Sequence, residues 1–532
     1  MSPRPSTAPP FNIVVGTIAF FAAFLLLGAV LWDDIVAAGS RRAVVVLGAI
    51  GVWRYGWAGI HLVRSLIYRR VRFPVLRRDA DQVAERELVP HVFFLVTSYR
   101  IDAEVSARVY RSVIEEAARY GAPATIVAAV TDAADEGLLA DLFARLEPPE
   151  GISLVLMRQA GTGKRDAMAG ILKAIARRTP PPGSLVVFMD GDTELVPDTL
   201  RRSLPFFRVL PGLGALSTDS RAAVEGSNWA KEWFDMRFAQ RHLLMCSLSL
   251  SRRLLVLTGR FSVFRAELAT DPSFIDILEN DVIDHWRHGR MKFLTGDDKS
   301  TWFWLLKHRW DMLYVPDVQV VTWEDLSDGG FVPASLGLMK RWFGNMLRNN
   351  GRAIALGPRA MPFFLWWTLI DQRLSMWTTL TGPTFAALMT VFVSPGFIAL
   401  YALWVMFTRF AQTLLLVSSR GRFSPYFPPL LYYTQIVGSL VKIYVLFRLD
   451  RQSWSRQGIR TLRRGGAGLW LRDASTVYIN MVAFGAFLLA MAYLSGVLPP
   501  PDALSLARFR TEATAPPPPL GTAAALVPGV KP

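Results

Sequence analysis

Long apolar segments at both ends of the chain constrain this sequence more than any other feature. Ile13–Leu31 contains no charged residue and is long enough, at about 1.5 Å per residue, to cross roughly 30 Å of hydrocarbon. Ala43–Val63 is a second candidate, weakened by Arg54, and an arginine-rich stretch follows it. Basic residues beside a membrane span mark its cytoplasmic side. Residues 1–64 are therefore expected to form two transmembrane helices, with the following chain in the cytoplasm.

The C-terminal part of the chain repeats this pattern. Residues 331–372 hold an aromatic and basic segment that is typical of amphipathic interface helices, and residues 373–498 are expected to contain transmembrane helices. A basic loop near 448–472 is expected in the cytoplasm. Three spans that start in the cytoplasm would place this loop on the opposite side of the membrane. Either Met361–Trp377 also crosses the membrane, or one of the apolar segments lies in the interface. The Pro- and Ala-rich tail, 499–532, is expected to be disordered. The expected spans are Leu374–Val393, Gly396–Val417, Pro428–Phe447 and Thr476–Leu498.

Residues 65–330 are predicted to form a cytoplasmic α/β domain. Apolar segments such as "HVFFLVTSY", "ATIVAAVTD" and "GSLVVFMDGD" alternate with segments of helical spacing. This alternation indicates a mostly parallel sheet with right-handed crossovers, and such sheets bind ligands beyond the carboxyl ends of their strands. The polar residues expected at those ends are Thr97, Tyr99, Asp132, Asp190 and Asp192.

The segment "MDGD" carries the strongest single signal of chemistry. Asp190 and Asp192 follow an apolar strand with one residue between them, so that both carboxylates can converge on one cation. Mg²⁺ and Mn²⁺ prefer such oxygen ligands and leave coordination positions for phosphate. The alternative is an ordinary turn, because Asp and Gly favour turns. The strand that precedes the two acids favours the metal site.

A loop with glycines, Gln159–Gly170, leads from an expected strand into a helix. Backbone N–H groups at a helix N-terminus attract phosphate, and Lys164 and Arg165 add positive charge. The sequence pattern of P-loop nucleotide hydrolases is absent. A plain helix start is the alternative.

Two adjacent acids, Asp297 and Asp298, precede a run of aromatic residues in "TGDDKSTWFW". Because Asp is common before a helical stretch, a helix cap is the simplest interpretation, and a metal site or a catalytic base are the alternatives. The nearby Asp281, Asp284, His285 and His288 are expected to lie on a helix surface, and a metal site is the alternative.

Taken in chain order, these motifs resemble those of the processive, membrane-embedded glycosyltransferases of family 2, which include cellulose, hyaluronan and chitin synthases. The resemblance implies a GT-A-like α/β domain inserted between N- and C-terminal transmembrane helices. Leu338 departs from the family's usual Gln, and Arg100 and Ile101 from its usual Asn. The motifs, between about residues 90 and 355, are "VTSYRIDAE", "VTDAADEG", "GKRDAMAG", "DGDTEL", "GRFSVFRAE", "TGDDKS" and "KRW".

The resemblance also implies a role for each matching residue. Asp298 corresponds to the catalytic base, and Trp342 to the residue that stacks on the acceptor sugar. Asp190 and Asp192 complete the catalytic set, as contacts of the nucleotide and of Mg²⁺ or Mn²⁺. The donor-binding residues that it implies are Thr97, Tyr99, Asp102, Asp132, Lys164, Asp190 and Arg341.

Within the family, "GDDKSTWFWLLK", "RWFGNMLRNNGRA" and "DQRLSMWT" resemble the alginate-polymerising, or mannuronan synthase, branch. That resemblance implies an inverting, processive transfer of mannuronic acid from GDP-mannuronate to β-1,4-polymannuronate, with export across a bacterial inner membrane. It also implies two kinds of partner, a separate cyclic di-GMP-binding co-polymerase subunit and periplasmic export proteins. Arg165 or Lys299 are candidates to pair with the sugar carboxylate.

Two other functions stay open: a cellulose-like or hyaluronan-like synthase that uses a UDP-sugar, and a non-catalytic membrane scaffold or transport subunit. The formal net charge of +16 suggests an anionic partner. Because the arginines gather at membrane boundaries, lipid headgroups explain this charge better than nucleic acid does. The single cysteine, Cys246, excludes an intramolecular disulfide and a cysteine-rich metal cluster.

Overall fold

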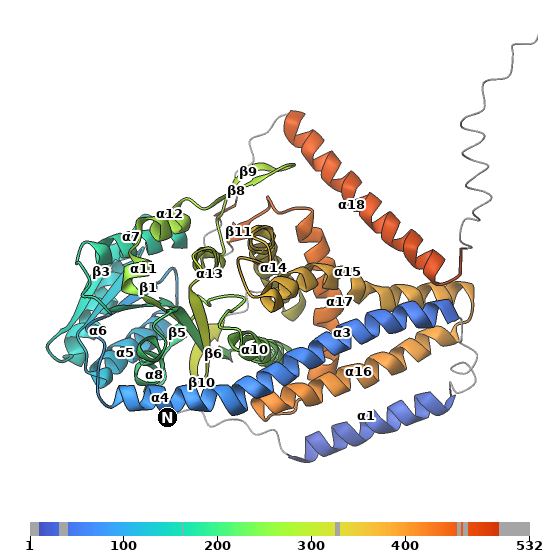
Figure 1. Ribbon diagram of the computed structural model, residues 1–532, viewed down its shortest axis with the longest axis horizontal. Helices are drawn as coiled ribbons and strands as arrows, with labels where there is room; N and C mark the ends of the chain where they lie inside the picture. Colours follow the sequence, from blue (N-terminus) through green and yellow to red (C-terminus); the bar gives the residue numbers. More distant parts are fainter. Residues whose placement is uncertain are drawn as a thin grey trace, which may run out of the picture.

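An α/β domain and a set of long helices make up the molecule (Figure 1). The computed structural model describes residues 10–30, 41–161, 163–324, 330–454, 459–460 and 467–498. The tail expected at 499–532 and part of the basic loop expected near 448–472 lie outside the described residues.

An eight-stranded sheet forms the centre of the α/β domain, in the order β3-β2-β1-β4-β7-β6-β10-β5. Strands β1 to β4 pair in parallel, as the sequence predicts, whereas β7 and β5 run antiparallel to their neighbours. Strands β1, β2 and β4 are buried along nearly their whole length, which explains why each reads as a continuous apolar run. The strands are β1 Val92–Thr97, β2 Ala124–Val130, β3 Ile152–Arg158, β4 Leu185–Asp190, β5 Thr193–Glu194, β6 Leu213–Val224, β7 Ser262–Arg265 and β10 Asp311–Glu324, with the separate two-stranded pairs β8 Val282–His285 with β9 Gly289–Lys292 and β11 Ser453–Trp454 with β12 Ile459–Arg460.

Helices cover both faces of this sheet. The helices α5 and α6 pack beside each other on one face, and α7 lies on the other face against β1 and β2 (Figure 1). This change of face follows from the strand order, because the chain returns after β3 to place β4 on the far side of β1. The helices of the domain are α5 Ala103–Tyr120, α6 Ala133–Leu146, α7 Lys164–Ala176, α8 Thr199–Ser203, α9 Phe206–Val209, α10 Asn228–Ser249, α11 Ala266–Ala269, α12 Pro272–Glu279 and α13 Asp297–Lys307.

The second N-terminal helix continues past the expected domain boundary. Helix α3 (Arg41–Ile67) runs through a π-helical turn, η1 (Tyr68–Arg72), into α4 (Phe73–Ala84). The turn is held on the α/β domain, where the Tyr68 hydroxyl donates to the Tyr314 carbonyl at 2.7 Å. The boundary expected at residue 64 therefore falls inside a continuous helical segment that joins the two parts of the molecule.

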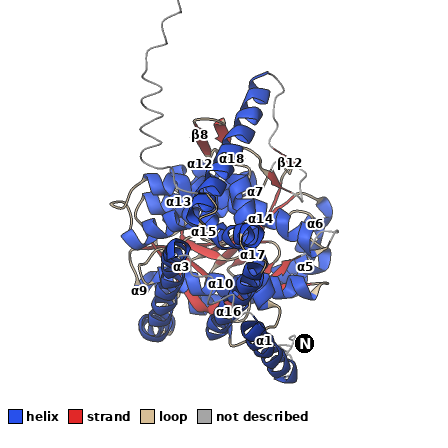
Figure 2. Ribbon diagram, turned by 90° about the vertical axis from the view of Figure 1, so that its right-hand side faces the viewer, coloured by secondary structure: helices blue, strands red, loops and turns tan. Residues whose placement is uncertain are grey.

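The C-terminal region supplies the helices that match the expected membrane spans. Among the described residues, three helical segments are long and apolar enough to cross a membrane: Gly396–Val417, Phe427–Leu446 and Trp470–Leu494. Helix α18 packs on α15 through the ring contacts of Trp377 with Phe484 and Phe487, and it projects beyond the other helices (Figure 2). The helices outside the α/β domain, besides α3 and α4, are α1 Pro10–Val30, α14 Phe331–Ala355, α15 Phe363–Phe392, α16 Gly396–Arg420, α17 Phe427–Leu446 and α18 Ala467–Leu494.

Arg54, the charge that weakened one of the expected spans, has a partner in α15. Arg54 of α3 donates to buried Asp371 of α15 at 2.7 Å. A buried charge is costly unless it is paired, so this ion pair explains how Asp371 is accommodated between α15 and α3. Helix α15 runs unbroken from Phe363 to Phe392, so Met361–Trp377 does not form a separate crossing, and that alternative is wrong.

Two long helices connect the sheet to the membrane helices. Helix α10 packs against β6 on one side and against α3 and α16 on the other, and α14 packs against α13 and α17. Their apolar side chains form one cluster with α17 that includes Trp233, Phe234, Met339, Phe343 and Leu431. A helix, α14, thus occupies the segment where an interface helix was expected, and it lies beside the carboxyl edge of the sheet.

Candidate active site

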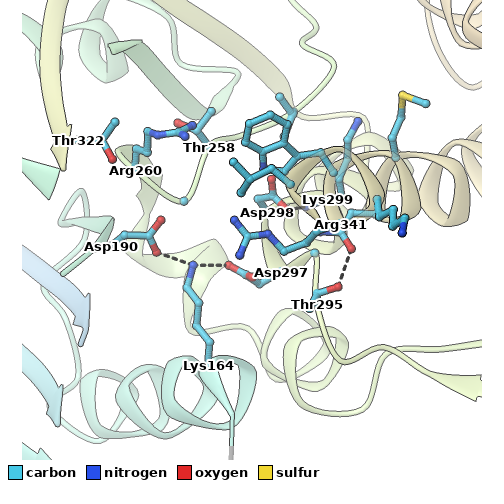
Figure 3. Close-up of a pocket in the computed structure, with 18 of the residues that line it drawn as sticks. Lys164, Asp190, Thr258, Arg260, Thr295, Asp297, Asp298, Lys299, Thr322 and Arg341 are labelled. Carbon is cyan, nitrogen blue, oxygen red and sulfur yellow. Dashed lines mark hydrogen bonds and ion pairs between the residues drawn. The ribbon is translucent and has the colours of Figure 1, made fainter. Parts of the chain in front are cut away.

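A cavity of about 1410 Å³ opens where β1 and β4 end. Parallel pairing sets Thr97 at the end of β1 directly beside Asp190 at the end of β4. The cavity extends from this edge to α10 and α14, and Figure 3 shows part of its lining. Eight residues expected from the sequence line it: Thr97, Tyr99, Lys164, Asp190, Asp192, Asp298, Arg341 and Trp342.

Lys164 lies between two carboxylates at the strand edge (Figure 3). Its ammonium is 2.6 Å from Asp190 Oδ1 and 2.9 Å from Asp297 Oδ2. Burial by itself would lower the pKa of Lys164, but these two carboxylates raise it above its ordinary value. Gly259 allows this close packing, since a Cβ there would lie 2.9 Å from Asp190 Oδ2 and 3.0 Å from Lys164 Nζ. The sequence did not reveal the Lys164–Asp297 contact, because these residues are far apart in the chain.

The two adjacent acids of α13 differ in their electrostatics. Burial would raise the pKa of Asp297, but Lys164 and Arg165 hold it below its usual value. Burial and the neighbouring Asp297 charge raise the pKa of Asp298 to about 6. The Lys299 N–H donates to Asp298 Oδ1 at 2.9 Å, which leaves a half-buried carboxylate at the cavity wall. A carboxylate with such a pKa is suited to accept a proton near neutral pH.

The helix cap proposed for these acids is wrong. Gly296 is the N-cap residue of α13, with φ of 86° and no side-chain cap, and both acids lie in the first turn. Gly is required there because of its positive φ and because a Cβ would lie 2.8 Å from Asn345 Cγ. Negative charge in the first helical turn is favourable, so the helix itself stabilises the acid pair.

Asp102 and Asp132 serve as helix caps and do not line the cavity. Asp102 accepts from the Glu104 and Val105 N–H groups at the start of α5, and Asp132 accepts from the Ala134 N–H at the start of α6. Both side chains are exposed, although their neighbours Ile101 and Thr131 do line the cavity. The donor-binding role of these two acids stays a prediction.

Asp190 and Asp192 present oxygen ligands to the cavity, as the metal hypothesis requires. Among the described residues, no group of three or more His, Cys, Asp and Glu side chains gathers in a metal-binding arrangement. Nearby, Arg260 donates to Glu324 at 2.6 Å, and Asp190 and Asp192 contribute to raising the pKa of Arg260. A divalent cation at this edge would therefore take its remaining ligands from outside the protein.

The opposite end of the cavity is aromatic. The Trp342 ring stacks on Trp233, with ring centroids 5.6 Å apart and an interplanar angle of 13°. The Arg237 guanidinium carbon lies 5.0 Å from the Trp342 ring centroid and 5.5 Å from that of Trp233. Trp342 is half-buried and keeps part of its surface at the cavity, where an aromatic ring can pack on a sugar.

Arg165 does not line the cavity, and Lys299 at the cavity wall is bonded to a backbone carbonyl. Arg165 is 4% exposed and donates to the Leu278 carbonyl at 3.1 Å and to Ser300 Oγ at 2.6 Å. Lys299 is buried and donates to the Leu255 carbonyl. These contacts hold α13 against its neighbours, since Ser300 and Lys299 both belong to α13. Pairing of Arg165 or Lys299 with a sugar carboxylate is therefore not favoured.

Asp284 and His285 lie in the strand β8 and His288 is buried in the turn after it, so the expectation of a helix surface is wrong for these residues. Asp281, which precedes β8, is not a helix-surface residue either. It is 5% exposed and accepts from both terminal nitrogens of Arg352, at 2.6 and 2.7 Å. Ser300 of α13 also donates to it. The sequence does not reveal this contact, because the partner Arg352, on α14, is remote in the chain. The contact ties α14 to the helix that carries Asp298.

Comparisons with known proteins identify the class to which this fold and site belong. Residues 90–345 match the family described as "Glycosyltransferase like family 2". The glycosyltransferase alg8 of Pseudomonas syringae pv. tomato (strain ATCC BAA-871 / DC3000) is 42% identical over 481 residues, which cover 90% of this chain and 97% of the relative. The glycosyltransferase alg8 of Azotobacter vinelandii is 42% identical over 474 residues, covering 89% and 96%.

The chain belongs to glycosyltransferase family 2, as its motifs suggested, and it groups there with the alg8 glycosyltransferases. The predicted enzyme class and the predicted GT-A-like fold with membrane helices are confirmed. Among solved structures, the mannosyltransferase PcManGT from Pyrobaculum calidifontis, in complex with GDP-Man and Mn²⁺, matches with a TM-score of 0.44 and 17% identity. That match covers 73% of this chain and 98% of the other.

Proposed function

We propose that this glycosyltransferase polymerises mannuronic acid from GDP-mannuronate into β-1,4-polymannuronate, the precursor of alginate, with Asp298 as the catalytic base. The observation that carries the proposal is one cavity that holds a carboxylate with a raised pKa, a lysine suited to a diphosphate and a tryptophan suited to a sugar. The alg8 relatives and the alginate-type motifs support the choice of sugar.

The reaction is a single in-line displacement. An acceptor hydroxyl forms a bond from its oxygen to the anomeric carbon of the donor, and the bond from that carbon to the diphosphate breaks. The electron pair leaves with the nucleoside diphosphate, and the hydroxyl proton passes to Asp298. One displacement inverts the configuration at the anomeric carbon, so that an α-linked donor gives a β-linked product.

Charge on the departing diphosphate requires stabilisation at the strand edge. Lys164 and Arg341 line the cavity and supply positive charge for this purpose. Asp190 and Asp192 fit a Mg²⁺ or Mn²⁺ ion, because two carboxylates leave the other coordination positions to phosphate oxygens and water. When bound, such an ion further offsets the charge of the leaving group.

The extent of the cavity supports export through the membrane helices. Gln372 of α15 and Tyr444 and Val445 of α17 line the same cavity as Asp298. A product that leaves the active site on this side enters the helices that match membrane spans. We therefore place the protein in a bacterial inner membrane as a multi-pass protein, with the α/β domain in the cytoplasm beside the arginines that favour that side.

The proposed partners follow from this assignment. The acceptor is the growing polysaccharide, and lipid headgroups surround the basic membrane boundaries. A separate cyclic di-GMP-binding co-polymerase subunit activates the transferase, and periplasmic export proteins receive the polymer.

Incorporation of radiolabelled sugar tests the proposal. Membranes that contain this chain and its activating partners are supplied with GDP-mannuronate, UDP-glucose or UDP-N-acetylglucosamine. We expect polymer from GDP-mannuronate alone, and none from membranes that carry Asp298→Asn. Polymer from a UDP-sugar, with none from GDP-mannuronate, would replace the alginate assignment by that of a cellulose-like or hyaluronan-like synthase.

A further inference from the structure

Arg237 of α10 lines the active-site cavity, and no carboxylate of the described residues pairs with it. Its guanidinium carbon lies within 6 Å of three ring centroids, at 5.0 Å from Trp342, 5.5 Å from Trp233 and 5.9 Å from Phe343. In the part of the chain that the structure describes, Arg237 forms no hydrogen bond or ion pair. The rings orient the guanidinium but leave its N–H donors without acceptors.

Another arginine of the same cavity, Arg260, does have a carboxylate partner. Arg260, on the strand-edge side, donates to Glu324 at 2.6 Å, so a carboxylate of the protein neutralises it. Burial first, and Arg260 second, lower the pKa of Arg237 to about 10. The half-buried guanidinium of Arg237 remains charged at neutral pH, and its charge is costly without a counterion. An anionic ligand at this end of the cavity would supply that counterion.

The shape of the site selects the anion. A guanidinium presents two parallel N–H donors, which match the two oxygens of a carboxylate. The Trp342 ring beside it offers a flat surface for a sugar. Phosphate groups of the donor are drawn instead to Lys164 at the strand edge. The pair of Arg237 and Trp342 therefore fits a sugar ring that carries a carboxylate.

We propose that Arg237 binds the carboxylate of the acceptor sugar that packs on Trp342, and thereby selects acidic over neutral acceptors. The inference rests on the proposed function, since it assigns the acceptor subsite of the same cavity. It replaces Arg165 and Lys299, which are committed to other contacts, as the residue that recognises the sugar carboxylate.

Binding of two matched oligosaccharides tests this assignment. The detergent-solubilised full chain is titrated with an oligomannuronate and with the neutral oligomannose of the same length made by carboxyl reduction, and tryptophan fluorescence reports binding. We expect Arg237→Gln to weaken binding of the acidic ligand at least about tenfold and to change binding of the neutral ligand less than about twofold. Arg237→Lys keeps the positive charge but loses the pair of parallel N–H donors, so its affinity for the acidic ligand should lie between those of the wild type and Arg237→Gln.

A matched control comes from the same helix. Lys231 is exposed and does not line the cavity, so Lys231→Gln removes one positive charge and should leave both affinities unchanged. Equal loss of both ligands in Arg237→Gln would indicate a disturbed Trp233–Trp342 stack and overturn the inference. Retained preference for the acidic ligand in that variant would overturn it too.

The two proposals fail in different ways. A wild-type chain that makes polymer only from a UDP-sugar and binds both oligosaccharides equally contradicts the proposed function. A wild-type chain that uses GDP-mannuronate and prefers the acidic ligand, with Arg237→Gln behaving likewise, contradicts only the assignment of Arg237.

Discussion

The strand edge of the cavity and the aromatic end around Trp342 differ in how the protein balances charge. At the strand edge the protein supplies its own counterions, as in the Lys164 contacts with Asp190 and Asp297 and the Arg260–Glu324 pair. At the aromatic end, Arg237 lies among rings, and no carboxylate of the described residues pairs with it. The first half is thus arranged before any ligand arrives, while the second is left for an anion to complete.

This difference indicates what each half recognises. A diphosphate and its cation must exchange with existing ion pairs, so that the strand edge can release the leaving group after each transfer. A sugar polymer must instead be held while it moves, and flat rings hold it without a fixed set of hydrogen bonds. Asp298 lies at the start of α13, on the wall of the cavity that both halves share (Figure 3).

Removal of the base should have the largest effect. Asp298→Asn keeps the shape of the side chain but cannot accept the hydroxyl proton, so we expect the initial polymerisation rate to fall by about 10²–10⁴-fold. Binding of the nucleoside diphosphate, measured by calorimetry, should be nearly unchanged. A variant with a wild-type rate would exclude Asp298 as the base.

Removal of the Lys164 ammonium group, which Asp190 and Asp297 share, should disrupt the strand-edge half of the cavity. In Lys164→Met, Asp190 and Asp297 lose their common partner, and the pKa of Asp297 should rise. We expect donor affinity to fall by about 10- to 100-fold, since a hydrogen bond to a charged group contributes about 1.5–3 kcal/mol. Lys164→Arg keeps the charge and should lose less. Equal donor affinity in all three proteins would contradict a diphosphate contact.

The pH dependence of the rate should separate the two adjacent acids. Asp298 must be ionised to act, and its pKa is raised to about 6 by burial and Asp297. At saturating donor, the rate should fall about fivefold between pH 6 and pH 5 and level off above pH 7. In Asp297→Asn the negative neighbour is lost, so the acidic limb should move to lower pH. A rate independent of pH from 5 to 7 would contradict this assignment.

Loss of the aromatic surface should affect only the aromatic end of the cavity. Trp342→Ala removes the ring that stacks on Trp233, and we expect acceptor affinity to fall by about 3- to 10-fold, which corresponds to the 0.5–1.5 kcal/mol of an aromatic contact. Trp342→Phe keeps an aromatic ring and should retain part of the acceptor affinity. Donor affinity, measured separately, should stay at the wild-type value, and a parallel loss of donor affinity would show that the two halves are not independent.

The sequence predicted the parts of the molecule that depend on local pattern. Apolar runs located β1 to β4, and the D-x-D spacing located Asp190 and Asp192 at the strand end. The strands β6, β7 and β10 were not located as parts of the sheet, because their pairing depends on tertiary contacts. The spacing of apolar residues within each strand does not reveal which strand it pairs with, or whether the pairing is parallel or antiparallel.

Contacts between remote residues account for what sequence reasoning missed at the site. Asp297 was seen as a cap because its partner, Lys164, belongs to a different motif. Arg165 was expected at a substrate, but packing of α12 and α13 buries it. Arg237 gave no signal beyond being one arginine among the aromatic residues of α10, since its role depends on the position of Trp342 in α14.

A single methyl group should disturb the strand edge more gently than loss of Lys164. In Gly259→Ala the new Cβ would lie 2.9 Å from Asp190 Oδ2 and 3.0 Å from Lys164 Nζ, closer than ordinary contacts allow. The ion pair has to shift by a few tenths of an ångström, so we expect the KM for the donor to rise by about 2- to 5-fold, within the effect of one perturbed hydrogen bond.

The matched control for Gly259→Ala is Gly337→Ala, because Gly337 also lines the cavity but has nothing within 4 Å of a new Cβ. It should leave the donor KM unchanged. A normal donor KM in Gly259→Ala would mean that the strand-edge half tolerates displacement, and that its ion pairs are not held in the geometry that the donor requires. The contrast between a preassembled half and an incomplete half would then rest on Arg237 alone.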